Sequence, residues 1–372
     1  MALSEPSSTA VPTAEATPEA TQPVIALFQP GTEVEIRTIQ MIDAAAGWAL
    51  GRADGSEDHV LKTSDGGETW QDVTPAEPLT VPSAVDAEAF FLDEETGWVG
   101  YVIDLPDSGP IEIHIWRTPD GGRSWEAGGT VSPTVYPENA SPGLLFLNAT
   151  TGWLLWEWHL GMGHHAFSLS RTFDGGTAWQ RLVGPPETES TCPRTGMAFA
   201  DPSNGWMTGE CPFDPGEGAL LEVSQDGGVS WQTRDLPPPM PGEMFCSARS
   251  PYLFGAAAGK LVLTCSPAGL QGQSFLYTTR DGATTWQISS FPGGTLYLLD
   301  PDHGWALSKD LYWTEDGGAT WTKIKTLAWE GQFSFVSAQL GWAVARSEEE
   351  TALVRTTDGG RAWELMEPII SP

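Results

Sequence analysis

The chain has 372 residues, of which 49 are acidic and 18 are basic, so its formal net charge is -31. A balance this acidic disfavours binding to nucleic acid or to an anionic membrane surface, because the phosphate groups would repel it. The sequence also contains no apolar run of membrane-spanning length.

The first segment differs in composition from the rest. Residues 4–23 are rich in Pro, Thr, Ala and Glu and lack core-forming periodicity, which is typical of a disordered tether. We therefore expect a tether over residues 1–30 and one folded domain over residues 31–372. Such tethers often follow a secretion signal, so the interpretation is an extracytoplasmic protein, either secreted or held in the cell envelope by a lipid anchor on the native N-terminus. The alternative is a cytoplasmic protein with a flexible start.

One phrase recurs seven times, first as Thr63-Ser-Asp-Gly-Gly-Glu-Thr-Trp70. Asp bonds nearby backbone N–H groups through its side chain, and Gly adopts positive φ at little cost, so each phrase predicts a turn between two strands. We call these the Asp turns. Their Asp residues are Asp65, Asp120, Asp174, Asp226, Asp281, Asp316 and Asp358. The Asp residues are separated by 55, 54, 52, 55, 35 and 42 residues, a period that indicates the blades of a propeller.

A Gly-Trp pair precedes six of the Asp turns. These pairs begin at Gly47, Gly97, Gly152, Gly205, Gly304 and Gly341. Short apolar or alternating runs such as Glu112–Trp116 lie between the two marks and predict strands, and no long helical period is present. The fold class is therefore all-β, a seven-bladed β-propeller of four-stranded antiparallel blades with one Asp turn in each. Residues 363–369 are expected to form the outer strand of blade seven, and residues 22–28 to add an edge strand.

The repeated phrase resembles the motif of the BNR or Asp-box family, Ser/Thr-x-Asp-x-Gly-x-Thr/Ser-Trp, across nearly all of residues 34–370. The clear departure is Ala283, which replaces the second Gly in the fifth phrase. Together with Gly-Trp, the phrase is most similar to the photosystem II stability and assembly factor group of seven-bladed propellers. The resemblance implies a fold and a structural role for the Asp residues, and says little about biological role.

The four cysteines share one register. Cys192 and Cys211 are 19 residues apart, as are Cys246 and Cys265, and each pair brackets a Gly at the same offsets. That register makes Gly259-Lys260 the degenerate Gly-Trp of blade five. We therefore predict the disulfides Cys192–Cys211 and Cys246–Cys265, which fit an oxidising compartment, with four reduced core thiols as the alternative. No metal site or cofactor is predicted, because no CxxC or Cys/His ligand spacing occurs.

Two sets of side chains are candidates for ligand binding. Arg37, Arg194 and Arg249 lie on predicted innermost strands and could converge as the arginine trio that a sialidase requires, although Arg37 lacks the following Pro of that family's signature. Salt bridging to acidic groups is the alternative. The second set forms an unusual cluster in blade three, where the two Trp residues share one strand face and could stack on a ligand or simply pack in the core. That cluster comprises Trp156, Trp158, His159, His164 and His165.

No catalytic constellation is recognisable in the sequence, so the sequence favours a non-catalytic, monomeric propeller that binds or helps to assemble a macromolecule through its top-face loops. The expected partner is a protein or a glycan of the cell envelope. The alternative class is a carbohydrate-active glycoside hydrolase, sialidase-like or polysaccharide-cleaving, or a lectin-like glycan binder. A carboxylate pair beside an aromatic group in one top-face pocket would favour the hydrolase.

Overall fold

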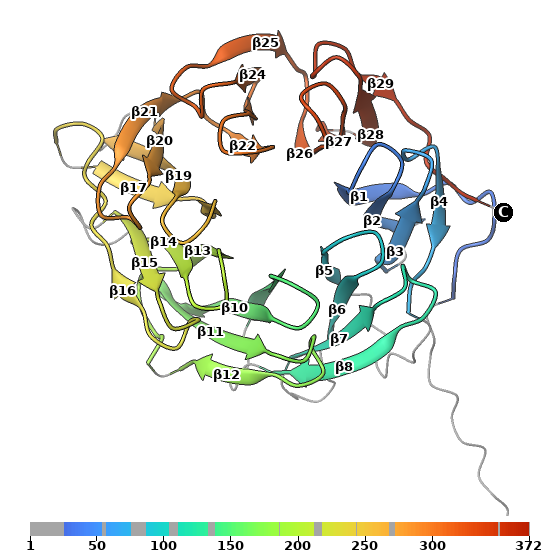
Figure 1. The fold of residues 1–372 in the computed structure, drawn as a ribbon, viewed down its shortest axis with the longest axis horizontal. Coiled ribbons are helices and arrows are strands. Elements are labelled where there is room, and N and C mark those ends of the chain that lie inside the picture. Colours follow the sequence, from blue (N-terminus) through green and yellow to red (C-terminus); the bar gives the residue numbers. More distant parts are fainter. Residues whose placement is uncertain are drawn as a thin grey trace, which may run out of the picture.

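The computed structural model describes residues 26–53, 57–75, 87–103, 111–132, 138–185, 187–211, 218–242, 244–267, 272–348 and 350–371. All regular structure in these ranges is β-strand. The strands form radial sheets around a ring, which is the architecture of a β-propeller (Figure 1). None of the described residues form a helix that could span a membrane.

The chain builds the ring in seven consecutive repeat units, each containing one Asp turn. Units one to three comprise β1 (Glu35–Met41), β2 (Gly47–Arg52), β3 (His59–Thr63), β4 (Thr69–Asp72); β5 (Ala87–Phe91), β6 (Gly97–Ile103), β7 (Glu112–Thr118), β8 (Glu126–Val131); and β9 (Glu138–Phe146), β10 (Gly152–Gly161), β11 (His164–Thr172), β12 (Gln180–Val183). Unit four comprises β13 (Arg194–Phe199), β14 (Gly205–Glu210), β15 (Ala219–Ser224) and β16 (Gln232–Thr233).

Unit five carries an extra short strand. It comprises β17 (Met244–Ala248), β18 (Tyr252–Leu253), β19 (Gly259–Pro267), β20 (Gln273–Thr279) and β21 (Gln287–Phe291). The last two units comprise β22 (Thr295–Leu298), β23 (Gly304–Leu307), β24 (Asp310–Thr314), β25 (Thr322–Thr326); and β26 (Glu330–Phe335), β27 (Gly341–Arg346), β28 (Thr351–Thr356), β29 (Glu364–Leu365). A final strand, β30 (Ile369–Ile370), follows them.

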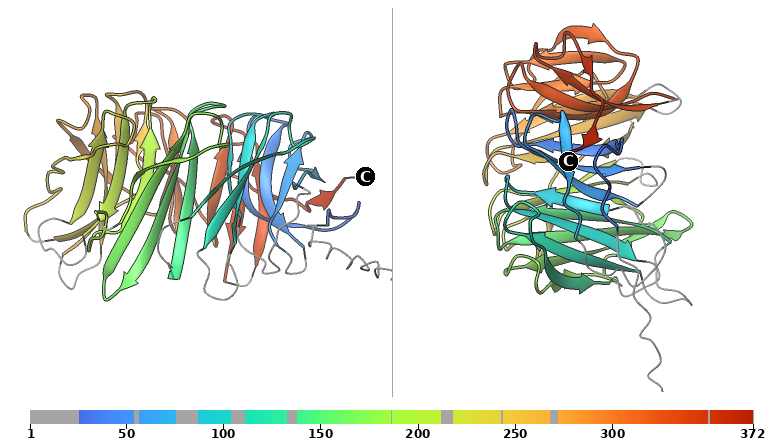
Figure 2. Two further views of the ribbon diagram at one scale, coloured as in Figure 1. Left: turned by 90° about the horizontal axis from the view of Figure 1, so that it is seen from below. Right: turned by 90° about the vertical axis from the view of Figure 1, so that its right-hand side faces the viewer.

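Hydrogen bonding joins these strands into six sheets within the described ranges. Units four and five share one nine-stranded sheet, and the single pair Glu210↔Ser247 links them. The described strands thus form seven repeat units in six sheets, because two units are fused at one residue pair, and the count of seven blades stays a prediction. In each unit the strands run between two faces of the ring (Figure 2). We call the face that carries the Asp turns the turn face and the opposite one the top face.

Six of the seven Asp turns are held by the same set of side-chain bonds. In unit one, the Thr63 hydroxyl donates to Asp65 Oδ1 at 2.8 Å and accepts from the Gly67 N–H at 2.9 Å, and Asp65 Oδ1 also accepts from the Thr69 N–H at 3.0 Å. Gly66 has φ of 78° and donates its N–H to the carbonyl of Ala45 in the loop between β1 and β2. The Asp65 side chain therefore organises the turn through its own hydrogen bonds.

The Gly-Trp residues join neighbouring units. Trp98 stacks on Phe146 of unit three with ring centroids 3.6 Å apart, and its indole N–H donates to the Gly175 carbonyl in the Asp turn of that unit at 2.7 Å. Trp153 repeats both contacts one unit further on. All six of these Trp side chains are 2% exposed or less, so they form a buried ring of contacts between the sheets.

The two predicted disulfides are present, Cys192–Cys211 in unit four and Cys246–Cys265 in unit five. Cys246 and Cys265 are directly opposite each other on β17 and β19. At the departure, Ala283 takes the positive φ of the replaced Gly, 65°, and the Thr279 hydroxyl still donates to Asp281 Oδ1 at 2.8 Å. The bond from the second turn N–H to the Thr hydroxyl, which the other six Asp turns contain, is not formed by Ala283.

The ring closes differently from the sequence-based expectation. The outer strand of unit seven is only Glu364–Leu365, and Ile369–Ile370 instead pairs in parallel with β4, so the prediction of an outer strand over residues 363–369 was correct only at its start. A two-residue strand carries no periodicity that could have revealed this. The predicted edge strand falls partly outside the described residues, and Phe28 at its end forms no strand but stacks on His59 at 3.8 Å. The predicted tether likewise lies mostly outside the described residues, so the domain boundary stays a prediction.

Candidate functional site

The three candidate arginines do not converge. Arg37 binds the fully buried carboxylate of Asp58 at 2.6 Å in unit one. Arg194 pairs with Glu222 at 2.9 Å and lies over the Phe167 ring at 4.7 Å. Burial lowers the pKa of Arg194, and the charge of Glu222 opposes that shift. Both side chains therefore serve structural ion pairs, which was the alternative interpretation, and no sialidase-type trio forms.

Arg249 behaves differently from the other two arginines. Its backbone N–H donates a hydrogen bond to the Val262 carbonyl. Its side chain is exposed, and the guanidinium has no hydrogen-bond or ion-pair partner among the described residues. It lines a cavity of about 510 Å³ together with Tyr252, Thr295 and Glu330. Arg249 is thus the one candidate arginine that is available to a ligand.

The Trp cluster of unit three is mostly core. Trp156 and Trp158 are both 0% exposed and pack against residues of unit two, so neither ring forms a stacking platform for a ligand. In a middle strand both faces are covered by neighbouring sheets, which is why alternation along the strand did not distinguish core from surface. The packing alternative is therefore correct for both residues.

The three histidines of this cluster lie near the hairpin between β10 and β11. His165 Nδ1 is 2.8 Å from Glu157 Oε1, and the rings of His159 and His165 are 4.7 Å apart. His164 is exposed. Within the described ranges no group of three or more His, Cys, Asp or Glu side chains is arranged to hold a metal ion.

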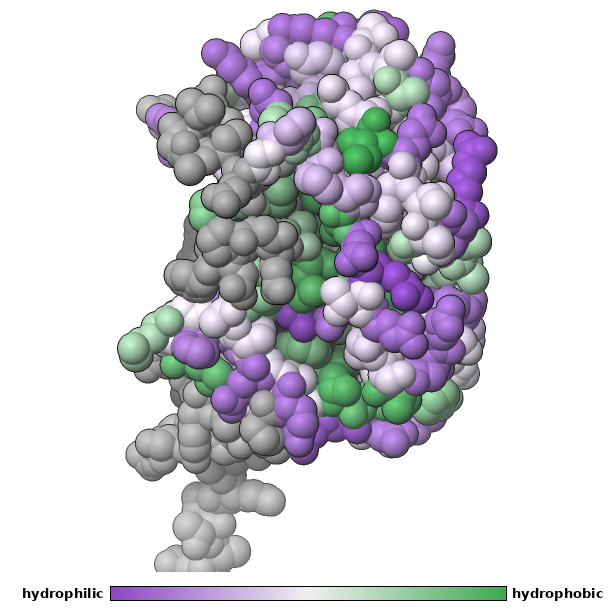
Figure 3. Space-filling model, turned by 90° about the vertical axis from the view of Figure 1, so that its left-hand side faces the viewer, coloured by the Kyte–Doolittle hydropathy of each residue, from purple (hydrophilic) through white to green (hydrophobic). Residues whose placement is uncertain are grey.

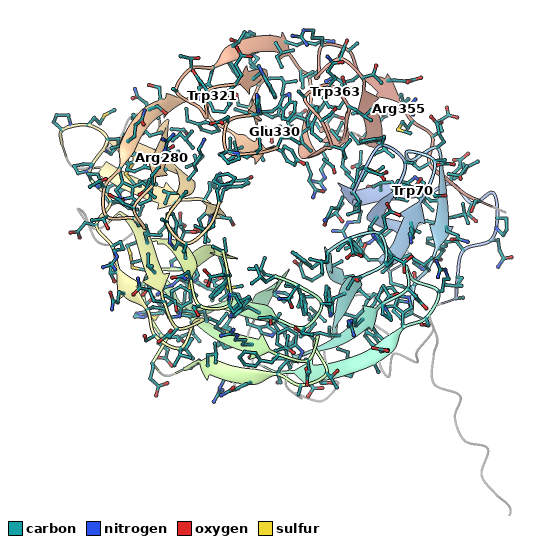
Figure 4. The ribbon with its side chains drawn as sticks, viewed as in Figure 1. Trp70, Arg280, Trp321, Glu330, Arg355 and Trp363 are labelled. Atoms are coloured by element: carbon teal, nitrogen blue, oxygen red, sulfur yellow. A yellow bond between two sulfur atoms is a disulfide. The ribbon has the colours of Figure 1, made fainter. Side chains whose placement is uncertain are left out.

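The strongest candidate site is a groove on the top face of units five to seven. A second cavity, of about 760 Å³, adjoins the cavity beside Arg249, and the two share Thr295, Ser308, Glu330 and Gly331. Both are lined by the first residues of β26 and by the β23–β24 turn, which lie at the top face, and the connection that precedes β26 lines the larger cavity. We call the joined cavities the top groove. Glu330 borders the centre of the ring where the two cavities meet (Figure 4).

The chemistry of the top groove is mixed. Glu330 and Glu348 are exposed carboxylates, Arg249 and Lys309 are exposed cations, and none of the four has an ion-pair partner among the described residues, so the groove offers free charges of both signs. Trp329 supplies an aromatic wall and is held by edge contacts to Phe333 and Trp363. The Tyr252 hydroxyl donates to the Leu296 carbonyl at 2.6 Å, and burial raises the pKa of Tyr252 to about 12. These rigid aromatic groups and free charges can bind an extended polar chain with apolar side groups.

The sequence reasoning missed Trp329 and Glu330, although a signal existed. Five Trp residues belong neither to a Gly-Trp pair nor to an Asp turn, and four of them lie on strands. Trp329 alone among them lies in a connection between units, where binding residues commonly occur.

One carboxyl group elsewhere in the ring is strongly perturbed. Glu88 lies on β5, the innermost strand of unit two, and burial raises its pKa to about 7, against an opposing backbone hydrogen bond from Leu144. Glu88 does not line the cavities beside Arg249 and Trp329. We therefore do not place Glu88 in the candidate site.

Comparison with known proteins agrees with the fold. No family model matches the chain. Among solved structures, "YCF48 bound to D1 peptide" is 19% identical with a TM-score of 0.52, covering 92% of this chain and 99% of that one. YCF48 from Cyanidioschyzon merolae is 17% identical with a TM-score of 0.50, covering 89% and 98%. A PL25 ulvan lyase is 9% identical with a TM-score of 0.54, covering 92% and 97%. These likenesses show a β-propeller fold.

A curated enzyme also matches part of this chain in sequence. A xyloglucanase from Paenibacillus sp. is 24% identical over 268 residues, which is 70% of this chain. The match spans only 23% of the length of that relative. The chain therefore corresponds to less than a quarter of the relative.

Proposed function

We propose that this protein is a non-catalytic, extracytoplasmic, seven-bladed propeller of the Asp-box type that binds an extended segment of another protein in the top groove. The observation that carries the proposal is that a free guanidinium, Arg249, and a free carboxylate, Glu330, line the same cavity as Tyr252. Such a site matches the alternating charges and apolar side chains of a peptide. The solved structure of YCF48 bound to a D1 peptide supports a peptide ligand for this fold.

Several features support the location and the rigidity of the site. The two disulfides brace the inner strands of units four and five beside Arg194 and Arg249, and they fit an oxidising compartment. The pair Glu210↔Ser247 fuses these two units into one sheet. A groove that is rigid before binding loses little conformational entropy when it binds. Residues 1–30 act as a tether in this proposal, and the propeller works as a monomer.

The test is selection of 12-residue peptides from a random display library on the purified protein, followed by affinity measurement. Arg249→Ala and Glu330→Ala should each weaken the selected peptides by about tenfold or more, as central interface residues do. Arg123→Ala is the matched control, because Arg123 is an exposed arginine in an Asp turn on the opposite face. Selected peptides that bind all four proteins equally would refute the top groove as the site.

A second function is favoured by one observation. Glu330 and Glu348 line the same cavity together with Trp329, which is the carboxylate pair beside an aromatic group that a glycoside hydrolase would need. The partial match to a xyloglucanase points to the same class. Both carboxylates are exposed to solvent, whereas the acid of a glycosidase is generally buried among apolar groups, so we rank this function second. Release of reducing sugar from xyloglucan that stops in Glu330→Gln would establish it.

A further inference from the structure

The interface between units five and six lacks the aromatic pair that holds other interfaces. In four interfaces a Gly-Trp indole stacks on a Phe of the next innermost strand, with ring centroids 3.6 to 4.7 Å apart. These pairs are Trp48–Phe91, Trp98–Phe146, Trp153–Phe199 and Trp305–Phe335. Between units five and six, the two equivalent positions hold Lys260 and Leu298, since Lys260 follows Gly259 and Leu298 pairs with Gly304.

Lys260 replaces the hydrogen bond of the missing indole but not its ring. Its ammonium group donates to the Gly317 carbonyl in the next Asp turn at 2.6 Å. At the following interface, the Trp305 indole donates to the carbonyl of Gly359, which holds the same position in its Asp turn. It also donates to the Pro301 carbonyl. The side chain is only 4% exposed, and burial lowers the pKa of its ammonium, with the charge of Asp302 opposing.

A crevice remains where an indole would fit. It measures about 210 Å³ on the turn face, and its walls include Lys260, Arg280, Pro301 and Ala319. Figure 4 labels Arg280 over unit five. Because drug-sized sites occupy roughly 300 to 1,000 Å³, this crevice suits a single ring system.

The walls of the crevice favour an aromatic occupant. Pro301 and Ala319 offer apolar surface, and Arg280 offers a cation that can face a π-system, while Asp302 and Asp316 also line the crevice. Arg280 is exposed and has no ion-pair or hydrogen-bond partner among the described residues, so its guanidinium is free to turn toward a ligand. The flank of the ring that includes units four and five is otherwise a mixture of polar and scattered apolar surface (Figure 3).

We propose that this crevice binds a flat aromatic group of the indole type, which fills the volume that a Gly-Trp side chain fills at the other interfaces. The ring is supplied either by a Trp side chain of a partner or by a free small aromatic molecule. The crevice lies on the turn face, so this site is separate from the top groove and does not depend on the proposed function.

The test uses 5-fluoroindole as the probe, with binding to the full-length protein followed by ¹⁹F NMR. We expect saturable binding with a Kd between about 0.1 mM and a few mM, which is usual for so small a ligand. Lys260→Trp restores the Gly-Trp pattern, so it should raise Tm and weaken binding at least about tenfold. Lys325→Trp adds the same side chain to the exposed outer strand β25 and should leave both quantities unchanged.

Further variants separate the alternatives. Ala319→Phe obstructs the crevice from its mouth and should also abolish binding, which keeps the test valid if Lys260→Trp does not fold. Comparing free indole with the peptide Gly-Gly-Trp-Gly-Gly distinguishes the two sources of the ring, because a partner's side chain must bind while attached to a backbone. Absence of binding by both probes, or binding that persists in Lys260→Trp and Ala319→Phe, would overturn the proposal.

Discussion

The indole N–H of Trp342 donates to the carbonyl of Gly66 at 2.8 Å, although the two residues are 276 positions apart in the chain. This bond joins the last repeat unit to the first Asp turn. It is the same contact that Trp98 and Trp153 make with the unit that follows each of them. Ring closure therefore reuses the repeated interface between units.

Trp342→Phe should destabilise the protein by about 1 to 3 kcal/mol, because it replaces a buried indole with a smaller phenyl ring and leaves the Gly66 carbonyl without its indole donor. Trp363→Phe is the matched control, since the buried Trp363 N–H has no hydrogen-bond partner among the described residues. Urea unfolding should show the larger loss for Trp342→Phe. Equal losses would mean that the hydrogen bond to Gly66 contributes nothing.

The C-terminal strand should stabilise the ring through one side chain. Ile370 is 4% exposed and belongs to the cluster that contains Trp70 and Trp342, whereas Ile369 is 38% exposed. Ile370→Ala is therefore expected to cost about 2 to 4 kcal/mol in the free energy of unfolding and Ile369→Ala under about 1 kcal/mol. Thermal or urea unfolding of the two variants measures the difference. If the order were reversed, β30 would not close the ring as described.

Glu88 should make stability depend on pH. Its pKa is raised from 4.5 to about 7 in the folded protein, so folding binds a proton in this window and stability falls as pH rises from about 4.5 to about 7. Glu88→Gln should remove this loss and gain up to about 3 kcal/mol above pH 7, with little change below pH 4. Glu187→Gln, at an exposed position, should leave the pH dependence of Tm unaltered. If the stability of Glu88→Gln fell with pH as steeply as that of the parent protein, the loss would not come from the burial of the Glu88 carboxylate.

Local chemistry made much of the fold predictable. The Asp turns are specified by residues four apart in the chain, such as Thr63 and Gly67, whose bonds form within one turn. The disulfides followed from the shared register of Cys192 and Cys246 with their neighbouring glycines. The same register identified Lys260 as the residue that stands in place of a Trp.

The site was less predictable because it is assembled from separate units. Arg249, Ser308 and Glu330 come from three units and meet only when the ring forms, so no local pattern marks the top groove. Trp156 and Trp158 failed as ligand-binding candidates for a related reason, since their burial depends on the neighbouring sheet and not on their own strand.

The most direct measurement of the central claim is amide hydrogen exchange of the protein with and without a display-selected peptide. A ligand in the top groove should slow exchange in residues 249–252, 294–296, 307–309 and 327–331, which line the groove. The Asp turns of units one to three should be unaffected. Slower exchange confined to the turn face, or to units one to three, would contradict binding in the top groove.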